Sequence, residues 1–325
     1  MARVAGAAPP RLKSAQDARR TIAALLKIPL GPPSVQADVR GTSTEDGLNV
    51  EDISWPAEDG QTVPSYLIRP AAGREPLPAI ICLHGTGGSR ASETTPKFGM
   101  GDWTRPGQNK PTTRMLGWAR ELARRGYITL SLTQRGLDTR TPDTTHQSKD
   151  FLVRGGTLMG ALVQEIRQGV SYLRTRPEVR NRGIGMTGMS FGGITTFYTW
   201  LADDRIAAAA PLCGGVGSVD VLLREGRPSY HGLYWWIPDM LTKGDHGDFA
   251  AAMAPRPLMI WAPTEDIGMP REGVDRFAAA VRPAYERGGS AQRLVIHQPP
   301  GEHSFTMEAF AAMRQFFDTE LRGVR

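Results

Sequence analysis

Short continuous hydrophobic runs alternate along this chain with longer stretches in which hydrophobic residues recur every three or four positions. The runs end in turn-forming residues, as buried strands do. They occupy residues 50–55, 63–68, 79–83, 127–132, 205–212, 257–262 and 293–297, and one more ends at Thr187. Helical spacing occupies residues 14–28, 115–126, 158–173 and 194–201, and a last helix passes through Phe310, Phe316 and Phe317. This alternation predicts an α/β fold with a mostly parallel central sheet and helices on both faces.

The predicted elements follow one another without an internal boundary, which favours one large domain over two. We assign residues 46–325 to this domain and residues 1–45 to an N-terminal helical extension. The polar segment 134–154 predicts a long irregular loop, and such loops in compact domains are often functional or mobile. Regular alternation also stops at about residues 214–255, which predict a small, lid-like insertion.

A Gly-x-Ser-x-Gly turn joins a predicted strand to a predicted helix. The strand ends at Thr187, Gly188 and Gly192 flank Ser190, and the apolar stretch 194–201 follows. In such a turn the serine takes a strained backbone conformation, and the glycines let strand and helix pass close together. The hydroxyl is raised above the sheet, where the helix N-terminus favours developing negative charge. The motif arises easily by chance in a glycine-rich chain, so its place between strand and helix is what makes Ser190 a candidate nucleophile.

A glycine-rich loop, His84-Gly85-Thr86-Gly87-Gly88-Ser89, directly follows the run 79–83. A serine hydrolase holds the oxyanion with the N–H of the residue after the nucleophile, here Phe191, and with a second N–H from such a loop. We assign the second donor to Thr86. His84 precedes the glycines and is interpreted as a loop-fixing residue, not as the catalytic base. The loop lacks the Gly-Lys-Ser/Thr ending of a nucleotide-binding loop, so a phosphate cradle is rejected.

Two later strands end in candidate partners for the serine. Glu265 and Asp266 follow the run 257–262, where a carboxylate can hold a histidine in the correct tautomer; we choose Asp266, with Glu265 second. His303 lies in the loop after the last strand and can fold back toward the serine as general base. His297, inside that strand, is interpreted as a core residue. The order Ser190, Asp266, His303 is the one that this fold requires.

Aromatic residues gather in the insertion beside the expected site. Tyr234, Trp235 and Trp236 are predicted to bind substrate as part of a lid or pocket wall. Ordinary packing within a small subdomain is an equally good explanation for any one of them.

Composition narrows the class of protein. The net charge is +6, but the basic residues are scattered among acidic ones, so we expect a solvated surface and no nucleic-acid partner. Cys82 and Cys213 sit in or next to apolar runs and predict small buried side chains, not a disulfide framework or a zinc site. The N-terminus lacks an apolar signal-peptide core, and the chain has no long apolar span. We therefore expect a cytoplasmic protein without a membrane partner.

The chain resembles the α/β-hydrolase superfamily, and within it the dienelactone hydrolase-like and acetylxylan esterase-like serine esterases, from about Val50 to the C-terminus. The stretches that carry the resemblance are Leu83 to Gly88, Gly188 to Gly193, Ala254-Pro255-Arg256-Pro257-Leu258, Glu265-Asp266 to Pro270, and Gly301 to Phe305. The resemblance implies Ser190 as nucleophile, His303 as general acid and base, and Asp266 as its orienting acid. Two departures limit it: true dienelactone hydrolases carry cysteine at the nucleophile, and Thr133 replaces a common aspartate before Arg135-Gly136.

These inferences predict a serine carboxylic ester hydrolase that works through an acyl-enzyme on a small to medium ester. We expect neither a cofactor nor a metal. A serine peptidase or amidase of the same fold is the main alternative, and a catalytically silent binding module is the other. The sequence leaves the oligomeric state open, with a homodimer among the options.

Overall fold

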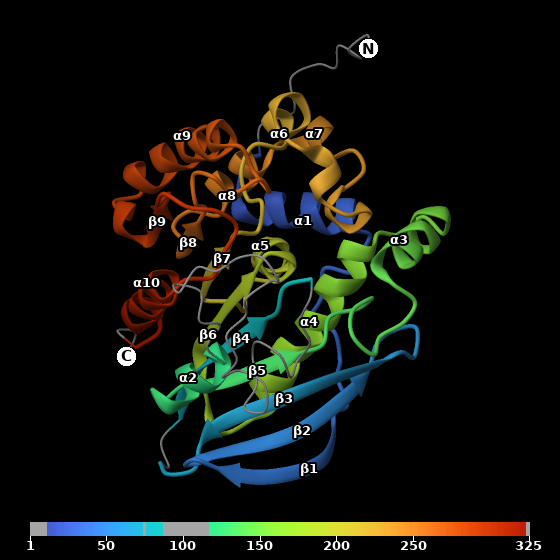
Figure 1. Cartoon of the computed structure of the whole chain (residues 1–325), viewed down its shortest axis with the longest axis vertical. Helices are drawn as coiled ribbons and strands as arrows, with labels where there is room; N and C mark the ends of the chain where they lie inside the picture. Colours follow the sequence, from blue (N-terminus) through green and yellow to red (C-terminus); the bar gives the residue numbers. More distant parts are fainter. Residues whose placement is uncertain (1–11, 74–75, 87–116, 323–325) are drawn as a thin grey trace.

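The computed structural model describes residues 12–73, 76–86 and 117–322, and in these residues nine strands form one sheet (Figure 1). Their order across the sheet is β1-β2-β3-β5-β4-β6-β7-β8-β9. The strands are β1 Asp38–Glu45, β2 Leu48–Pro56, β3 Thr62–Pro70, β4 Leu77–Leu83, β5 Ile128–Leu132, β6 Val179–Met189, β7 Ala208–Leu212, β8 Leu258–Trp261 and β9 Leu294–His297. The first three strands and the β3–β5 pair are antiparallel, whereas β5, β4, β6, β7, β8 and β9 run parallel. The parallel strands end at the same edge.

Helices cover both faces of the sheet (Figure 1). They are α1 Ala15–Leu26, α2 Trp118–Arg124, α3 Thr144–Val153, α4 Leu158–Thr175, α5 Phe191–Ala202, α6 Val219–Glu225, α7 Met240–Lys243, α8 His246–Ala252, α9 Arg271–Arg287 and α10 Met307–Phe317. One core cluster joins the sheet to α1, α4, α5, α8 and α9, and the other joins it to α2 and α10. The predicted α/β architecture is confirmed.

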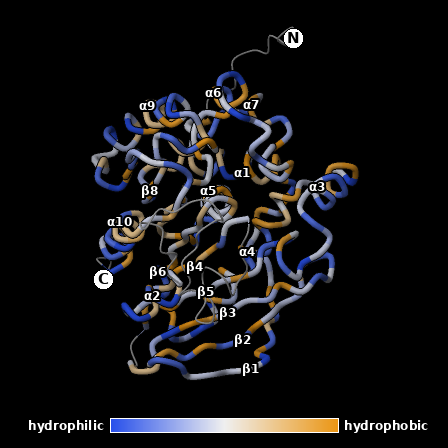
Figure 2. The backbone as a smooth tube through the Cα atoms, in the orientation of Figure 1, coloured by the Kyte–Doolittle hydropathy of each residue, from blue (hydrophilic) through white to orange (hydrophobic). Residues whose placement is uncertain are grey.

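Three elements differ from the prediction. Strand β1 was not predicted, because all eight of its residues are exposed and show no hydrophobic alternation; its tube is mainly pale or blue in Figure 2. It pairs with β2 through a two-residue turn in which Asp46 and Gly47 have φ of 49° and 75°, the conformation that an Asp-Gly hairpin favours. The sheet therefore begins at Asp38, inside the segment that we assigned to the N-terminal extension.

The segment 134–154 also contains a helix where we predicted an irregular loop. Helix α3 begins after Asp143, whose carboxylate accepts a hydrogen bond from the His146 N–H at 2.9 Å. Such an N-cap stabilises a helix without any contribution from a hydrophobic face.

Strand β7 is shorter than the predicted run 205–212. Asp203 accepts hydrogen bonds from the backbone and side chain of Arg205, and these bonds form a turn before the strand.

Helix α1 packs into the larger core cluster. Ala18, Ile22, Leu25 and Leu26 are buried on its inner face, and the helix contacts α4, α5 and α8. The regularly spaced hydrophobic residues of α1 therefore form the face that packs into the core, and α1 is an integral part of the helix layer on this side of the sheet.

Candidate active site

Ser190 stands at a sharp turn between the central strand β6 and helix α5. Its backbone has φ 56° and ψ −114°, a strained conformation for a residue with a side chain. A Cβ added to Gly188 would lie 2.2 Å from the Gly192 carbonyl oxygen, and one added to Gly192 would lie 2.3 Å from the Leu83 carbonyl oxygen. Neither position has room for any other residue, so the two glycines permit the turn that raises Ser190.

Asp266 and His303 form a hydrogen-bonded pair. The Nδ1 of His303 lies 2.9 Å and 3.0 Å from the two carboxylate oxygens of Asp266. Asp266 is buried, and its Oδ1 also accepts a hydrogen bond from the Gly268 N–H at 2.7 Å. Glu265 is exposed instead, so the structure brings Asp266 and not Glu265 to the imidazole. The bond through Nδ1 leaves Nε2 as the nitrogen available to a reacting group.

Four neighbouring strands bring these residues to the same edge of the sheet. Ser190 follows β6, Cys213 follows β7, Asp266 comes after β8, and His303 comes after β9. Backbone hydrogen bonds tie the last two loops together, from the Thr264 N–H to the Pro299 oxygen and from the Glu265 N–H to the Gly301 oxygen, each at 2.9 Å. Ligands bind α/β sheets at this edge.

The two predicted oxyanion donors lie at the same edge. Phe191 is the first residue of α5, so its N–H has no acceptor within the helix. Thr86 is exposed, three residues beyond β4, and its side chain interacts with the phenol of Tyr234. Gly87 and Gly88 of the predicted loop lie outside the described residues. Burial raises the pKa of Tyr234 to about 12, so its phenol keeps its proton at neutral pH.

His84 fixes the loop that carries Thr86. Its ring is fully buried, Nδ1 lies 2.8 Å from the Gly85 oxygen, and Nε2 accepts the Gln134 N–H at 3.1 Å. These partners assign the proton to Nδ1. Gln134 also bonds to the His84 oxygen and to Thr195 of α5. Burial lowers the pKa of His84 to about 4, which keeps the ring neutral in the loop-fixing role that we inferred.

The three aromatic residues predicted to bind substrate occupy different environments. The Tyr234 ring meets the Phe191 ring edge-on at a centroid distance of 4.4 Å. Trp235 is 1% exposed and lies beneath the stacked ring of His231, so it supports its neighbours from within the core. Trp236 packs against Trp235 at 4.8 Å. Tyr234 is therefore the member of the group that directly contacts a predicted site residue.

Sequence reasoning treated Cys213 as packing alone, and the structure places it within the site. Its Sγ donates to the Ser304 oxygen at 3.5 Å, and among the described residues Cys213, Asp266 and His303 bring ligand atoms within 4.8 Å of one another. Burial and the Asp266 carboxylate raise the pKa of this thiol well above its usual value. Since the thiolate is the nucleophile and the metal ligand, this protonated thiol suits neither role. The sequence feature that could have identified Cys213 as a site residue is its position directly after β7.

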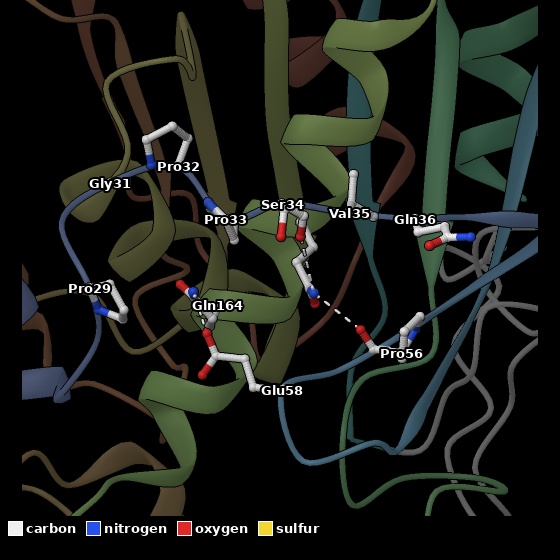
Figure 3. Close-up of a pocket in the computed structure, with 11 residues that line it drawn as sticks. Pro29, Gly31, Pro32, Pro33, Ser34, Val35, Gln36, Pro56, Glu58 and Gln164 are labelled. Atoms are coloured by element: carbon white, nitrogen blue, oxygen red, sulfur yellow. Dashed lines mark hydrogen bonds between the residues drawn. The ribbon is translucent and has the colours of Figure 1, made fainter.

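A cavity of about 490 Å³ lies apart from these residues (Figure 3). The proline-rich linker 29–36 lines it, with Pro56, Glu58 and α4. Gln164 donates to Glu58 at 2.8 Å, and Arg167 of the same helix donates to the carbonyls of residues 29–31. The cavity is thus the space left where the linker is attached to α4, and none of the candidate catalytic residues lines it.

The family model of the X-Pro dipeptidyl-peptidases, S15 family, matches residues 59–254. The chain belongs to this family. The S15 match includes Ser190 and Thr86 but ends before Asp266 and His303. The predicted recognition of an α/β-hydrolase is confirmed, and the protein is a hydrolase.

Individual relatives of this S15-family chain are distant. "Putative hydrolase YtaP" of Bacillus subtilis (strain 168) is 25% identical over 243 residues, which are 74% of this chain and 78% of that protein. The glucuronoyl esterase from Solibacter usitatus superposes with a TM-score of 0.68 at 17% identity, covering 98% of this chain and 100% of that one. For the acetyl xylan esterase from Paenibacillus sp. R4 the TM-score is 0.63 at 17% identity, covering 97% and 98%. At these identities the solved structures support the fold.

None of the helices in the described part of the chain combines the length and the apolar character that a bilayer crossing requires.

Proposed function

We propose that this protein is a serine carboxylic ester hydrolase in which Ser190, His303 and Asp266 form a catalytic triad. The observation that carries the proposal is the combination of a strained serine turn with a hydrogen-bonded Asp266–His303 pair, all at the ends of neighbouring parallel strands. Serine, histidine and aspartate are the residue types from which such a triad is built, which supports the proposal.

The proposed reaction has two halves. Ser190 Oγ attacks the ester carbonyl carbon while His303 Nε2 takes the hydroxyl proton, and the N–H groups of Phe191 and Thr86 stabilise the oxyanion. The protonated histidine then gives that proton to the leaving alkoxide, and the alcohol departs. A water molecule, deprotonated by the same histidine, releases the acyl group as a carboxylic acid and restores Ser190. Asp266 holds the imidazole in the required tautomer throughout.

The solved structures that this fold resembles favour esters as substrates. The structural neighbours named above are esterases that act on glucuronoyl and acetyl xylan esters. The S15 family model favours the second candidate, cleavage of a peptide bond after proline. Both reactions can use the same triad. They differ in the leaving group that the histidine must protonate, which is an alkoxide for an ester and an amine for a peptide.

Paired substrates separate the two candidates. We expect measurable turnover of 4-nitrophenyl acetate and at least about a hundredfold lower kcat/KM for an aminoacyl-proline anilide, a difference of about 3 kcal/mol in transition-state stabilisation. The reverse ranking would favour the peptidase. Labelling of Ser190 by a fluorophosphonate should disappear in Ser190→Ala. A folded wild-type protein that neither turns over nor labels would point to a silent binding module.

A further inference from the structure

The insertion reaches the Asp266–His303 pair through two consecutive residues. The Tyr230 ring meets the His303 ring edge-on, with centroids 5.7 Å apart and planes at 74°. The Nε2 of His231 lies 2.5 Å from the Gly268 carbonyl oxygen. Gly268 in turn donates its N–H to Asp266 Oδ1. A chain of hydrogen bonds therefore runs from His231 through Gly268 to the carboxylate that holds His303.

His231 is itself firmly placed. Its ring stacks on Trp235 with centroids 4.5 Å apart and planes at 16°, and Trp235 is packed in the core. On another side Gly215, with φ 70°, approaches so closely that an added Cβ would lie 2.9 Å from His231 Cε1. Burial lowers the pKa of His231, which favours the neutral ring. With a carbonyl as its partner, Nε2 carries the proton and donates it.

We propose that His231 is a positioning residue for the hydrolysis proposed above, because it anchors the carbonyl of Gly268, the residue whose N–H is hydrogen-bonded to Asp266. The role rests on the proposed function. His231 does not act as a second base, since its Nε2 proton is committed to the Gly268 carbonyl. It ties the insertion to the acid loop, so the insertion contributes to the geometry of the triad as well as to its surroundings.

Substitutions that separate the two contacts of His231 test this role. His231→Phe keeps a ring for Trp235 but removes the donor, and His231→Gln replaces the ring with an amide N–H near the position of Nε2. Leu233→Ala is the matched control, because Leu233 lies in the same insertion and is exposed. For 4-nitrophenyl acetate we expect His231→Phe to lower kcat by about tenfold to a hundredfold, as small misplacements of catalytic groups do. KM should stay within about twofold, since this interaction matters in the transition state.

A spectroscopic readout makes the test independent of turnover. The proton between His303 Nδ1 and Asp266 should give a far-downfield NMR signal that is absent from His303→Ala. We expect this signal to broaden or vanish in His231→Phe, and both signal and kcat to recover substantially in His231→Gln. Wild-type kcat and an unchanged signal in His231→Phe would overturn the proposal. Should His231→Phe fail to fold, a folded His231→Ala protein that keeps both the wild-type kcat and the downfield signal would also overturn it.

Failure of the proposed function has a different signature. In that case the wild-type protein would show no ester turnover and no fluorophosphonate labelling, while the downfield signal would still report on the contact between His231 and the acid loop.

Discussion

The serine side of the site and the acid–base side are held in place by different means. Around Ser190, backbone meets backbone at glycines: Gly188 lies against Gly192 within the turn, and Gly192 lies against Leu83 of the neighbouring strand β4. Asp266 and His303 instead stand on two loops that depend on each other and on Tyr230 and His231 of the insertion. The first geometry is fixed by steric contacts between backbone atoms, whereas the second is held by a network of hydrogen bonds and ring contacts between loops. We therefore expect substitutions in the serine turn to disrupt the fold, and substitutions in the acid–base pair to leave the fold intact.

Gly192→Ala should have the largest effect. The new methyl would overlap the Leu83 carbonyl at 2.3 Å, so either the turn opens or the protein does not fold. We expect loss of soluble protein, or folded protein with no detectable fluorophosphonate labelling, scored by circular dichroism and gel fluorescence. Gly41→Ala is the control, because an added Cβ at Gly41 meets no atom within 4 Å. A well-folded, fully active Gly192→Ala protein would disprove the steric account.

Asp266→Asn comes next. The amide can still contact His303 Nδ1 but favours the wrong tautomer, and this change costs about 10⁴-fold in kcat in a serine protease triad. We expect a loss of about 10³- to 10⁴-fold in ester hydrolysis with the fold retained. Glu265→Gln, one residue earlier and exposed, should remain within about twofold of wild type, as surface changes do. A large effect at Glu265 instead would reassign the acid.

Acid should weaken the serine side through His84. Burial lowers the pKa of His84 from 6.5 to about 4 in the folded protein, so the unfolded chain binds more protons as pH falls below 6.5. Stability is therefore fully present above pH 6.5 and is lost as pH falls toward 4; between pH 7 and pH 4.5 this site should contribute about 2 kcal/mol of the loss. Urea unfolding of wild type and His84→Asn at both pH values measures it. An equal pH-dependent loss in both proteins would argue against a buried neutral His84.

Cys213→Ala should have the smallest effect. It removes a weak thiol hydrogen bond to the Ser304 oxygen, for which we expect about 1 kcal/mol of stability and less than about threefold in kcat. Thermal unfolding and steady-state kinetics give both numbers. A drop in kcat beyond about tenfold at unchanged stability would mean that the thiol orients the Asp266–His303 pair, and the two sides of the site would then be coupled through β7.

The same contrast explains what could be predicted from the sequence. Hydrophobic runs located the buried strands, and Ser190, Asp266 and His303 each follow such a run, so topology alone brought them to one edge. Strand β1 was missed because every residue is exposed, although its Asp-Gly turn was a usable signal. Helix α3 was missed because it is stabilised by its N-cap, Asp143, and the spacing of hydrophobic residues does not detect such a cap.

Contacts between distant segments were beyond prediction for a physical reason. The meeting of His231 with Gly268 depends on how the insertion folds over the sheet, and neither residue stands in a repeating pattern. Cys213 was assigned to packing because its burial is visible in the sequence, whereas its proximity to Asp266 follows from the adjacency of β7 and β8.

The attachment of α1 has a practical consequence for handling this protein. Arg167 fastens the linker that follows α1 to α4, so the helix is secured at its C-terminal end as well as by its buried face. A protease that clipped the chain in the linker and released α1 would uncover the apolar surface that Ile22, Leu25 and Leu26 now cover. A newly exposed patch of this kind promotes aggregation. Shortened versions intended for crystallisation should therefore retain the chain from Ser14 onward.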